Sequence, residues 1–106
     1  AATVTAAREQ SAVASAPTVA NVGIFASPAV APNPSRKSMW FQNVSTTAIY
    51  LGLGATPSAT LYHLVLASGT QPHNGTGGVY FDSEWLGQVN VISGAATGTL
   101  CYGETT

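Results

Sequence analysis

The chain has 106 residues, of which three are basic and four acidic, so charged residues make up 7% and the formal net charge is −1. This length predicts a single domain, because domains commonly span about 50 to 250 residues. Three basic side chains cannot neutralise many phosphates, which argues against a nucleic-acid-binding protein. Low charge combined with 45% hydrophobic residues also argues against a wholly disordered chain.

The sparse charge has a consequence for the surface. Charge of moderate magnitude normally keeps small domains apart in solution, and this chain lacks it. We therefore expect partner molecules to cover much of the surface, the alternative being an uncharged surface of Ser, Thr, Asn and Gly. No apolar run reaches the roughly 20 residues that cross a bilayer, so a membrane is not an expected partner.

The first third of the chain differs in composition from the rest. Residues 1–17 are rich in Ala, Ser and Thr and predict an extended or disordered arm that orders on a partner, with a short helix as the alternative. Residues 18–25 predict a strand. Three prolines within residues 27–34 exclude a helix or a central strand and predict a stiff linker. The predicted organisation is an arm at 1–17, a strand plus Pro-rich linker at 18–34 and a β domain at 35–106.

The remaining chain is a succession of short strand-like runs with turn residues between them. The alternation is clearest in residues 47–53, where Ile49, Leu51 and Leu53 share one face. Strands without intervening helical patterns predict an all-β fold, a small antiparallel sandwich or jelly-roll-like domain, or a small barrel, with an extended N-terminal arm. Strands are predicted at 38–44, 47–53, 60–66, 79–81, 85–93 and 97–102, with a long loop at 67–78.

The residues that carry chemistry are few. His63 is expected to pack within a strand and His73 to lie exposed in a loop, and neither belongs to a nucleophile motif. Two histidines and Cys101, the only cysteine, are too few and too scattered for a zinc site. Asp82 and Glu84 point the same way if they share a strand, which would suit a calcium ion or a glycosidase pair. Two solvated carboxylates are the favoured alternative, so we expect no enzyme, no metal and no cofactor.

Five short motifs follow one another in a particular order from residue 33 onward. They read NPSR at 33–36, QNVS at 42–45, AIYLGLG at 48–54, WLGQVNVIS at 85–93 and GTLCYGE at 98–104. In this order they resemble small virion structural proteins of tailed bacteriophages. That resemblance implies a head decoration, or cement, protein: β-rich, often trimeric, without catalytic residues, and seated on the shell where major capsid subunits meet.

The expected function is therefore a non-enzymatic cement on the capsid surface, made in the host cytoplasm, with the major capsid protein and its own copies, as a homotrimer, as partners. The apolar residues of 18–25 are predicted to insert into the shell or to extend a sheet, and two basic residues to pair with an acidic shell surface. Alternatively, 18–25 is the first strand of the domain's own core. The predicted contact residues are Val19, Val22, Ile24, Phe25, Arg36 and Lys37.

The sequence is also compatible with a second class of function. Aromatic side chains on a β face could stack on sugar rings, which would make the chain a tail, spike or fibre module that binds a host-surface glycan. Core or interface packing is the more common role of such residues.

Overall fold

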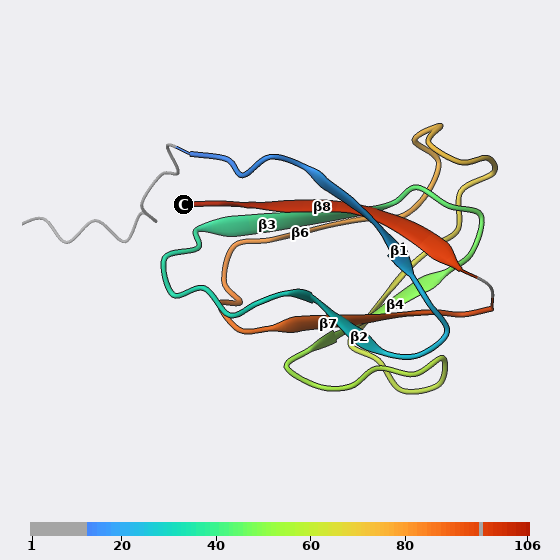
Figure 1. Ribbon diagram of the computed structural model, residues 1–106, viewed down its shortest axis with the longest axis horizontal. Coiled ribbons are helices and arrows are strands. Elements are labelled where there is room, and N and C mark those ends of the chain that lie inside the picture. Colours follow the sequence, from blue (N-terminus) through green and yellow to red (C-terminus); the bar gives the residue numbers. More distant parts are fainter. Residues whose placement is uncertain (1–12, 96) are drawn as a thin grey trace, which may run out of the picture.

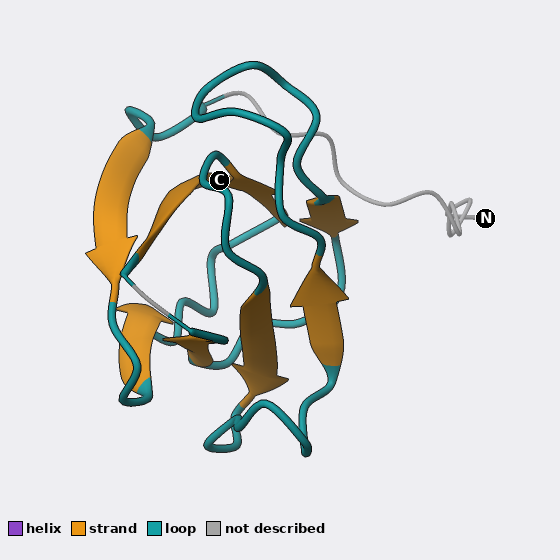
Figure 2. Ribbon diagram, turned by 90° about the vertical axis from the view of Figure 1, so that its right-hand side faces the viewer, coloured by secondary structure: helices purple, strands orange, loops and turns teal. Residues whose placement is uncertain are grey.

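The computed structural model describes residues 13–95 and 97–106, and every regular element in this part of the chain is a β-strand (Figures 1 and 2). The strands are short and follow one another with turns or loops between them. In chain order they are β1 (Thr18–Val22), β2 (Ser27–Val30), β3 (Ser38–Asn43), β4 (Ile49–Leu53), β5 (Leu64–Leu66), β6 (Val79–Asp82), β7 (Val89–Ser93) and β8 (Gly98–Thr105).

The strands form two four-stranded sheets that face each other (Figure 2). Sheet A has the order β1-β8-β3-β6 and sheet B the order β2-β7-β4-β5, and every pairing is antiparallel. The short turn from β1 to β2 places these two edge strands on the same side of the molecule. The fold is therefore the all-β sandwich that the sequence predicted.

The core lies between the two sheets and follows the alternation of each strand. Ile49, Leu51 and Leu53 of β4 share one face, as the pattern in residues 47–53 predicted; Ile49 and Leu51 are fully buried, and Leu53 is partly buried. Met39 and Phe41 of β3 face them from sheet A. The ring of Phe41 lies against the rings of Tyr80 and Tyr102. Burial of these apolar side chains is the main stabilising contribution in a domain of this size. The buried core comprises Val22, Val30, Met39, Phe41, Ile49, Leu51, Leu66, Val89, Val91 and Leu100.

Residues 18–30 belong to the sandwich. Residues 27–34, predicted as a linker, contain strand β2, which lies at the edge of sheet B and shifts register between Pro28 and Val30. An edge strand tolerates proline because one side of its backbone needs no ladder donor. Strands β1 and β2 thus complete the two sheets. Of the predicted arm, 1–12 lie outside the described residues, and Ala14 forms an antiparallel bridge to Thr105.

Two strands begin four residues later than predicted, while the other predicted strand bounds agree or differ by at most three residues. Strand β5 covers only Leu64–Leu66 of the predicted 60–66, because Ser58 closes a turn with its main-chain N–H on the Leu61 carbonyl at 2.8 Å. The predicted strand 85–93 begins at Val89. Local alternation cannot locate such ends, since a turn can carry apolar side chains as well.

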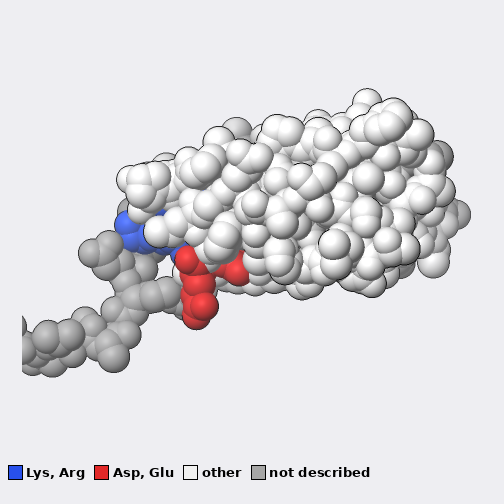
Figure 3. Space-filling model, turned by 90° about the horizontal axis from the view of Figure 1, so that it is seen from below, with Lys and Arg blue, Asp and Glu red and all other residues white. Residues whose placement is uncertain are grey.

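The sandwich has two different ends. Strand β8 runs between them: its first residue, Gly98, pairs with Val22, and Thr105 pairs with Ser38. The turn between β1 and β2 therefore lies at one end, which we call the turn end. Arg36 and Lys37 lie just before β3 at the other end, which we call the charged end. Figure 3 shows the coloured charged side chains gathered at one end of the visible face.

Asn43, the last residue of β3, binds several main-chain groups around it. It is 1% exposed, and its amide nitrogen donates to the carbonyls of Thr47 (2.7 Å), Leu66 (3.0 Å) and Ala67 (3.2 Å). Its amide oxygen accepts from the main-chain N–H of Ser45 at 3.0 Å. Asn43 thereby fixes the turn after β3 to the start of the long loop.

Gly77 gives a test of this packing. A Cβ at Gly77 would lie 1.8 Å from the main-chain oxygen of Asn43, whereas a Cβ at Gly23 would meet nothing within 4 Å. We expect Gly77→Ala to lower the free energy of unfolding by about 1–3 kcal/mol, because backbone must move to admit the methyl group. Urea unfolding followed by fluorescence measures this. Gly23→Ala is the control, and equal stabilities of the two variants would contradict the described packing.

Candidate interaction surfaces

Arg36 is buried at the charged end, where it holds several segments together. Its side chain is 1% exposed and its Nε donates to a carboxylate oxygen of Glu104, in β8, at 2.7 Å. Its two terminal nitrogens donate to the carbonyls of Ala31 and Trp85, both at 2.8 Å. A guanidinium can do this because it presents several donors in a fixed planar fork. Arg36 thus joins β8 to the loops that follow β2 and β6.

The rest of the NPSR motif supports this ion pair. Asn33 donates from its amide nitrogen to the second carboxylate oxygen of Glu104 at 3.2 Å. Its amide oxygen accepts the main-chain N–H of Ser35 at 3.0 Å, which forms the turn before Arg36. The role expected for Arg36, pairing with an acidic shell surface, does not agree with this geometry. The guanidinium is enclosed and already paired with the chain's own carboxylate.

The predicted contact residues do not form one surface. Val22 is 2% exposed and belongs to the core, which agrees with the alternative that 18–25 starts as a strand of the domain itself. Val19 is 56% exposed on the edge strand of sheet A, while Ile24 and Phe25 are 53% and 81% exposed at the turn end. Lys37 lies half-buried at the opposite, charged end.

The outer face of sheet A carries apolar residues that the sequence analysis did not single out. Val79 and Phe81 of β6 are 65% and 63% exposed. Trp40 lies beside them in β3, opposite Phe81, and its ring covers Gly103 so closely that a Cβ there would be 2.2 Å away. Val79, Tyr80 and Phe81 are all apolar or aromatic, so no alternation in the sequence indicates which side of this strand faces the core.

Asp82 closes the turn after β6. It accepts hydrogen bonds from the Tyr80 hydroxyl and from the main-chain N–H groups of Glu84 and Trp85, the latter two at 2.7 Å. Partial burial by itself raises the pKa of Asp82, but these hydrogen bonds and the charge of Arg36 outweigh it, so the pKa lies below its ordinary value. Burial and the neighbouring carboxylate raise the pKa of Tyr80, which keeps its phenol protonated. Asp82 is therefore a turn-forming residue.

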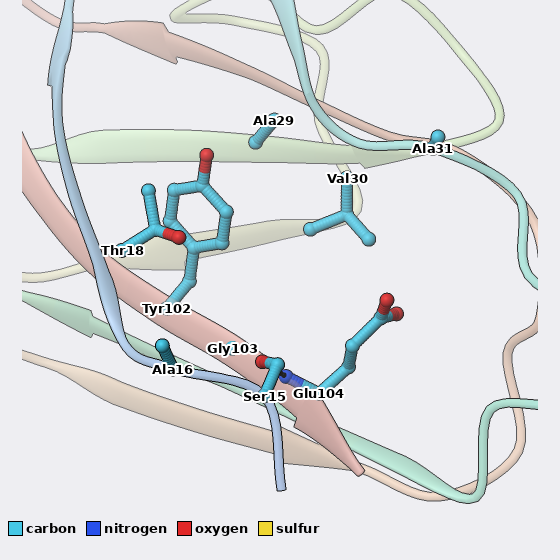
Figure 4. A pocket seen from close by; sticks show the side chains of 9 residues that line it. All are labelled: Ser15, Ala16, Thr18, Ala29, Val30, Ala31, Tyr102, Gly103 and Glu104. Carbon is cyan, nitrogen blue, oxygen red and sulfur yellow. Dashed lines mark hydrogen bonds between the residues drawn. The ribbon is translucent and has the colours of Figure 1, made fainter. Parts of the chain in front are cut away.

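A hollow of about 280 Å³ opens between the two sheets on the β1–β2 side (Figure 4). Tyr102, Thr18 and Glu104 line it together with small side chains from β2 and the segment before β1. Glu104 is the one carboxylate among the described lining residues, and its two oxygens accept from Asn33 and Arg36 respectively. The hollow is thus lined by hydroxyls and small apolar groups.

A second hollow of about 280 Å³ lies beside the end of β4. It is lined by Gly52, Leu61, Tyr62 and His63 among others, and the ring of Tyr62 lies 4.8 Å from that of Tyr50. The Nδ1 of His63 accepts the main-chain N–H of Leu53 at 2.9 Å. His63 lies just before β5 and is exposed, so the prediction that it packs within a strand was wrong. His73 is exposed in its loop, as predicted.

Comparisons of the chain with protein-family models, with curated proteins and with solved structures found no match. Within residues 13–95 and 97–106, no three His, Cys, Asp or Glu side chains are grouped so that they could hold a metal ion. In the same part of the chain, no helix is of the length and apolar character that a membrane crossing needs.

Removal of the Arg36 side chain tests its role. We expect Arg36→Ala to lower the free energy of unfolding by about 3 kcal/mol or more, since loss of one partner leaves the other without its counter-charge in a partly enclosed site. Urea unfolding at pH 7 measures this. The matched control is Glu84→Ala at an exposed position, with an expected change within about 0.5 kcal/mol. A similarly small effect of Arg36→Ala would contradict the described network.

Acidification tests Asp82. Because its pKa is lower in the folded than in the unfolded chain, ionised Asp82 stabilises the fold above about pH 4, and this contribution is lost as the pH falls through the folded pKa. We expect Asp82→Asn to be less stable than the wild type at pH 7 and to lose less stability down to pH 2. Denaturant unfolding across this range measures both, with Glu84→Gln as the control. Parallel profiles for wild type and Asp82→Asn would be the contrary result.

Proposed function

We propose that this chain is a non-enzymatic structural protein of a bacteriophage particle, a decoration protein that binds the outside of the head and stabilises capsomer junctions. Its partners are the major capsid protein and further copies of itself, as a homotrimer, and it is made in the host cytoplasm. The order of motifs in residues 33–104 supports this, because it resembles that of small virion proteins of tailed phages. The β-sandwich fold is compatible with it.

The observation that carries the shell-binding part is the apolar tip of the turn end. Ile24 and Phe25 are consecutive and 53% and 81% exposed. Single exposed apolar side chains are common on monomers, but two adjacent ones at the tip of a turn form a patch that favours contact with a partner. Covering the exposed part of each side chain would contribute roughly 1–2 kcal/mol of binding free energy, since neither is fully exposed beforehand.

The position of the described charges supports the same orientation. Arg36, Lys37, Asp82, Glu84 and Glu104 lie in segments at the charged end. A decoration protein needs one side that enters an interface and another that stays hydrated. The turn end suits the shell, because its described residues bring no charge that would lose its hydration, and the charged end suits solvent.

Weak individual contacts suffice in this arrangement. A homotrimer that presents three turn ends to neighbouring capsomers binds with a high effective concentration after the first contact. The avidity therefore exceeds the affinity of one Ile24–Phe25 tip. A domain of this size also gains stability from association, since its own core is modest.

A second candidate function has one observation in its favour. The Tyr50–Tyr62 ring pair lies beside the hollow at Leu61 and His63, and such an aromatic wall with a hydrogen-bonding edge is suited to a sugar ring. The two tryptophans suit this less, since Trp40 covers Gly103 and Trp85 donates its Nε1–H to the Gln88 carbonyl at 3.0 Å. A host-surface glycan bound at Tyr62 is the alternative.

Co-sedimentation with empty heads of the source virus tests the shell proposal. We expect the wild-type chain to bind the heads and the double variant Ile24→Ser, Phe25→Ser to lose about tenfold or more in affinity, because two apolar contacts are removed. Val65→Ser, at a position that is 45% exposed on sheet B, is the matched control and should bind like the wild type.

Two results would contradict the shell proposal. One is a wild-type chain that stays in the supernatant, and the other is a double variant that binds as well as the wild type. Retention of the wild type on host-surface polysaccharide, abolished by Tyr62→Ala, would favour the glycan alternative. Circular dichroism of each variant confirms that the sandwich is intact.

A further inference from the structure

The two sheets differ in how their edges are protected. Edge strands normally carry a device that prevents pairing with another chain, such as proline, a bulge, inward charge or short length. In sheet B, β2 contains Pro28 and a register shift, and β5 has only three residues. In sheet A, the edge strands β1 and β6 contain no proline and no described register shift. The one charged residue of these two strands, Asp82, is the last residue of β6, and its carboxylate accepts the main-chain N–H groups of Glu84 and Trp85 in the turn that follows.

The register of sheet A fixes which backbone groups of β1 face outward. The main-chain N–H of Val44 donates to the Thr99 carbonyl at 3.1 Å, so Thr99 directs its backbone toward β3. Because directions alternate along a strand, Leu100 and its even-numbered neighbours direct theirs toward β1. Leu100 pairs with Ala20, so the N–H and C=O groups of Val19 and Asn21 point away from the sheet, toward the open edge.

The same reasoning applies at the opposite edge. The main-chain N–H of Asn43 donates to the Gly78 carbonyl at 2.9 Å, so alternate residues of β3 from Asn43 direct their backbone toward β6. Phe41 is one of these and pairs with Tyr80. The backbone groups of Val79 and Phe81 therefore point outward at the β6 edge.

The side chains at the two edges match as well. Val19 at one edge and Val79 and Phe81 at the other are 56%, 65% and 63% exposed, and all three lie on the outer face of sheet A. The remaining outward-facing residue is Asn21. Neither edge thus presents a charged side chain on this face, and two copies that meet here bring no like charges together.

Strand polarity decides how two copies can join. Sheet A has four antiparallel strands, an even number, so β1 and β6 run in opposite directions. A second copy placed alongside in the same orientation therefore brings its β1 antiparallel to β6 of the first. In one register Phe81 lies opposite Val19 of the neighbouring copy, and Val79 lies opposite its Asn21. The outward N–H and C=O groups of the two strands then face each other, and the outer faces of the two sheets lie on the same side.

We propose that sheet A continues between copies of this chain, with β6 of one copy pairing with β1 of the next in this register. Such a head-to-tail contact uses two different surfaces and covers both edges of every copy once the ring closes. Pairing β6 with β6 would leave every β1 edge open. This inference deepens the self-association part of the proposed function and does not depend on shell binding.

Sedimentation of the full chain tests the contact. We expect the wild type to associate at micromolar concentration, and Val19→Lys or Phe81→Lys to shift the dissociation constant upward by tenfold or more, because lysine blocks an edge. Val65→Lys, on the outer face of β5 in sheet B, is the control and should associate like the wild type. A wild type that stays monomeric up to about 1 mM, where even a contact worth about 4 kcal/mol is half formed, would overturn the proposal. Unchanged association of both edge variants would overturn it as well.

Disulfide trapping tests the register without relying on affinity. Two chains carry single cysteines, Val19→Cys and Phe81→Cys, each with Cys101→Ser. Opposed residues of a hydrogen-bonded pair have Cα atoms about 5.5 Å apart, which a disulfide spans. We expect cross-linked dimers on oxidation of the mixture and none from either chain alone. Cross-linking confined to a mixture of Val79→Cys and Phe81→Cys chains would show a symmetric β6–β6 contact and overturn the proposal.

Discussion

The enclosed guanidinium of Arg36 is the interaction on which the charged end of the sandwich depends. Its donors reach carbonyls of Ala31 and Trp85 and the carboxylate of Glu104. These acceptors belong to segments on both sheets, so the two layers are joined there by a polar group rather than by apolar packing alone. A buried charge of this kind is tolerated because each of its three nitrogens donates to an acceptor. The geometry of the nearby loops follows from that requirement.

The alternation of backbone direction imposes a second constraint, on sheet A. Each strand can satisfy its hydrogen-bonding groups on two sides, and β3 and β8 use both sides. β1 and β6 use one side only, and the residues whose backbone remains outward are also those whose side chains lie on the outer face. Val19, Val79 and Phe81 are exposed because they lie on the outer face, and the same residues also present unpaired backbone groups at the two edges.

Part of this structure was open to prediction from the sequence. Period-two alternation reports directly which side chains share a face, so the strand at Ile49–Leu53 and its buried residues could be predicted. The order of strands is set by pairings between distant segments, and so local rules could not find that Pro28 lies on an edge where it is tolerated. The burial of Arg36 could not be predicted either, because its partners Trp85 and Glu104 are remote in sequence. The exposure of Val79 and Phe81 could not be predicted without the register in which β6 pairs with β3.

Asn43 has a consequence for chemical modification of the chain. Together with Val44 and Ser45 it forms the tripeptide that oligosaccharyltransferases accept in secretory compartments. In the folded domain its amide nitrogen is enclosed and donates to three carbonyls, those of Thr47, Leu66 and Ala67. A glycan on that nitrogen would have no room and would displace these bonds. A chain expressed through a eukaryotic secretory pathway and modified there before folding could not close the turn after β3, so such expression hosts are unsuited to this protein.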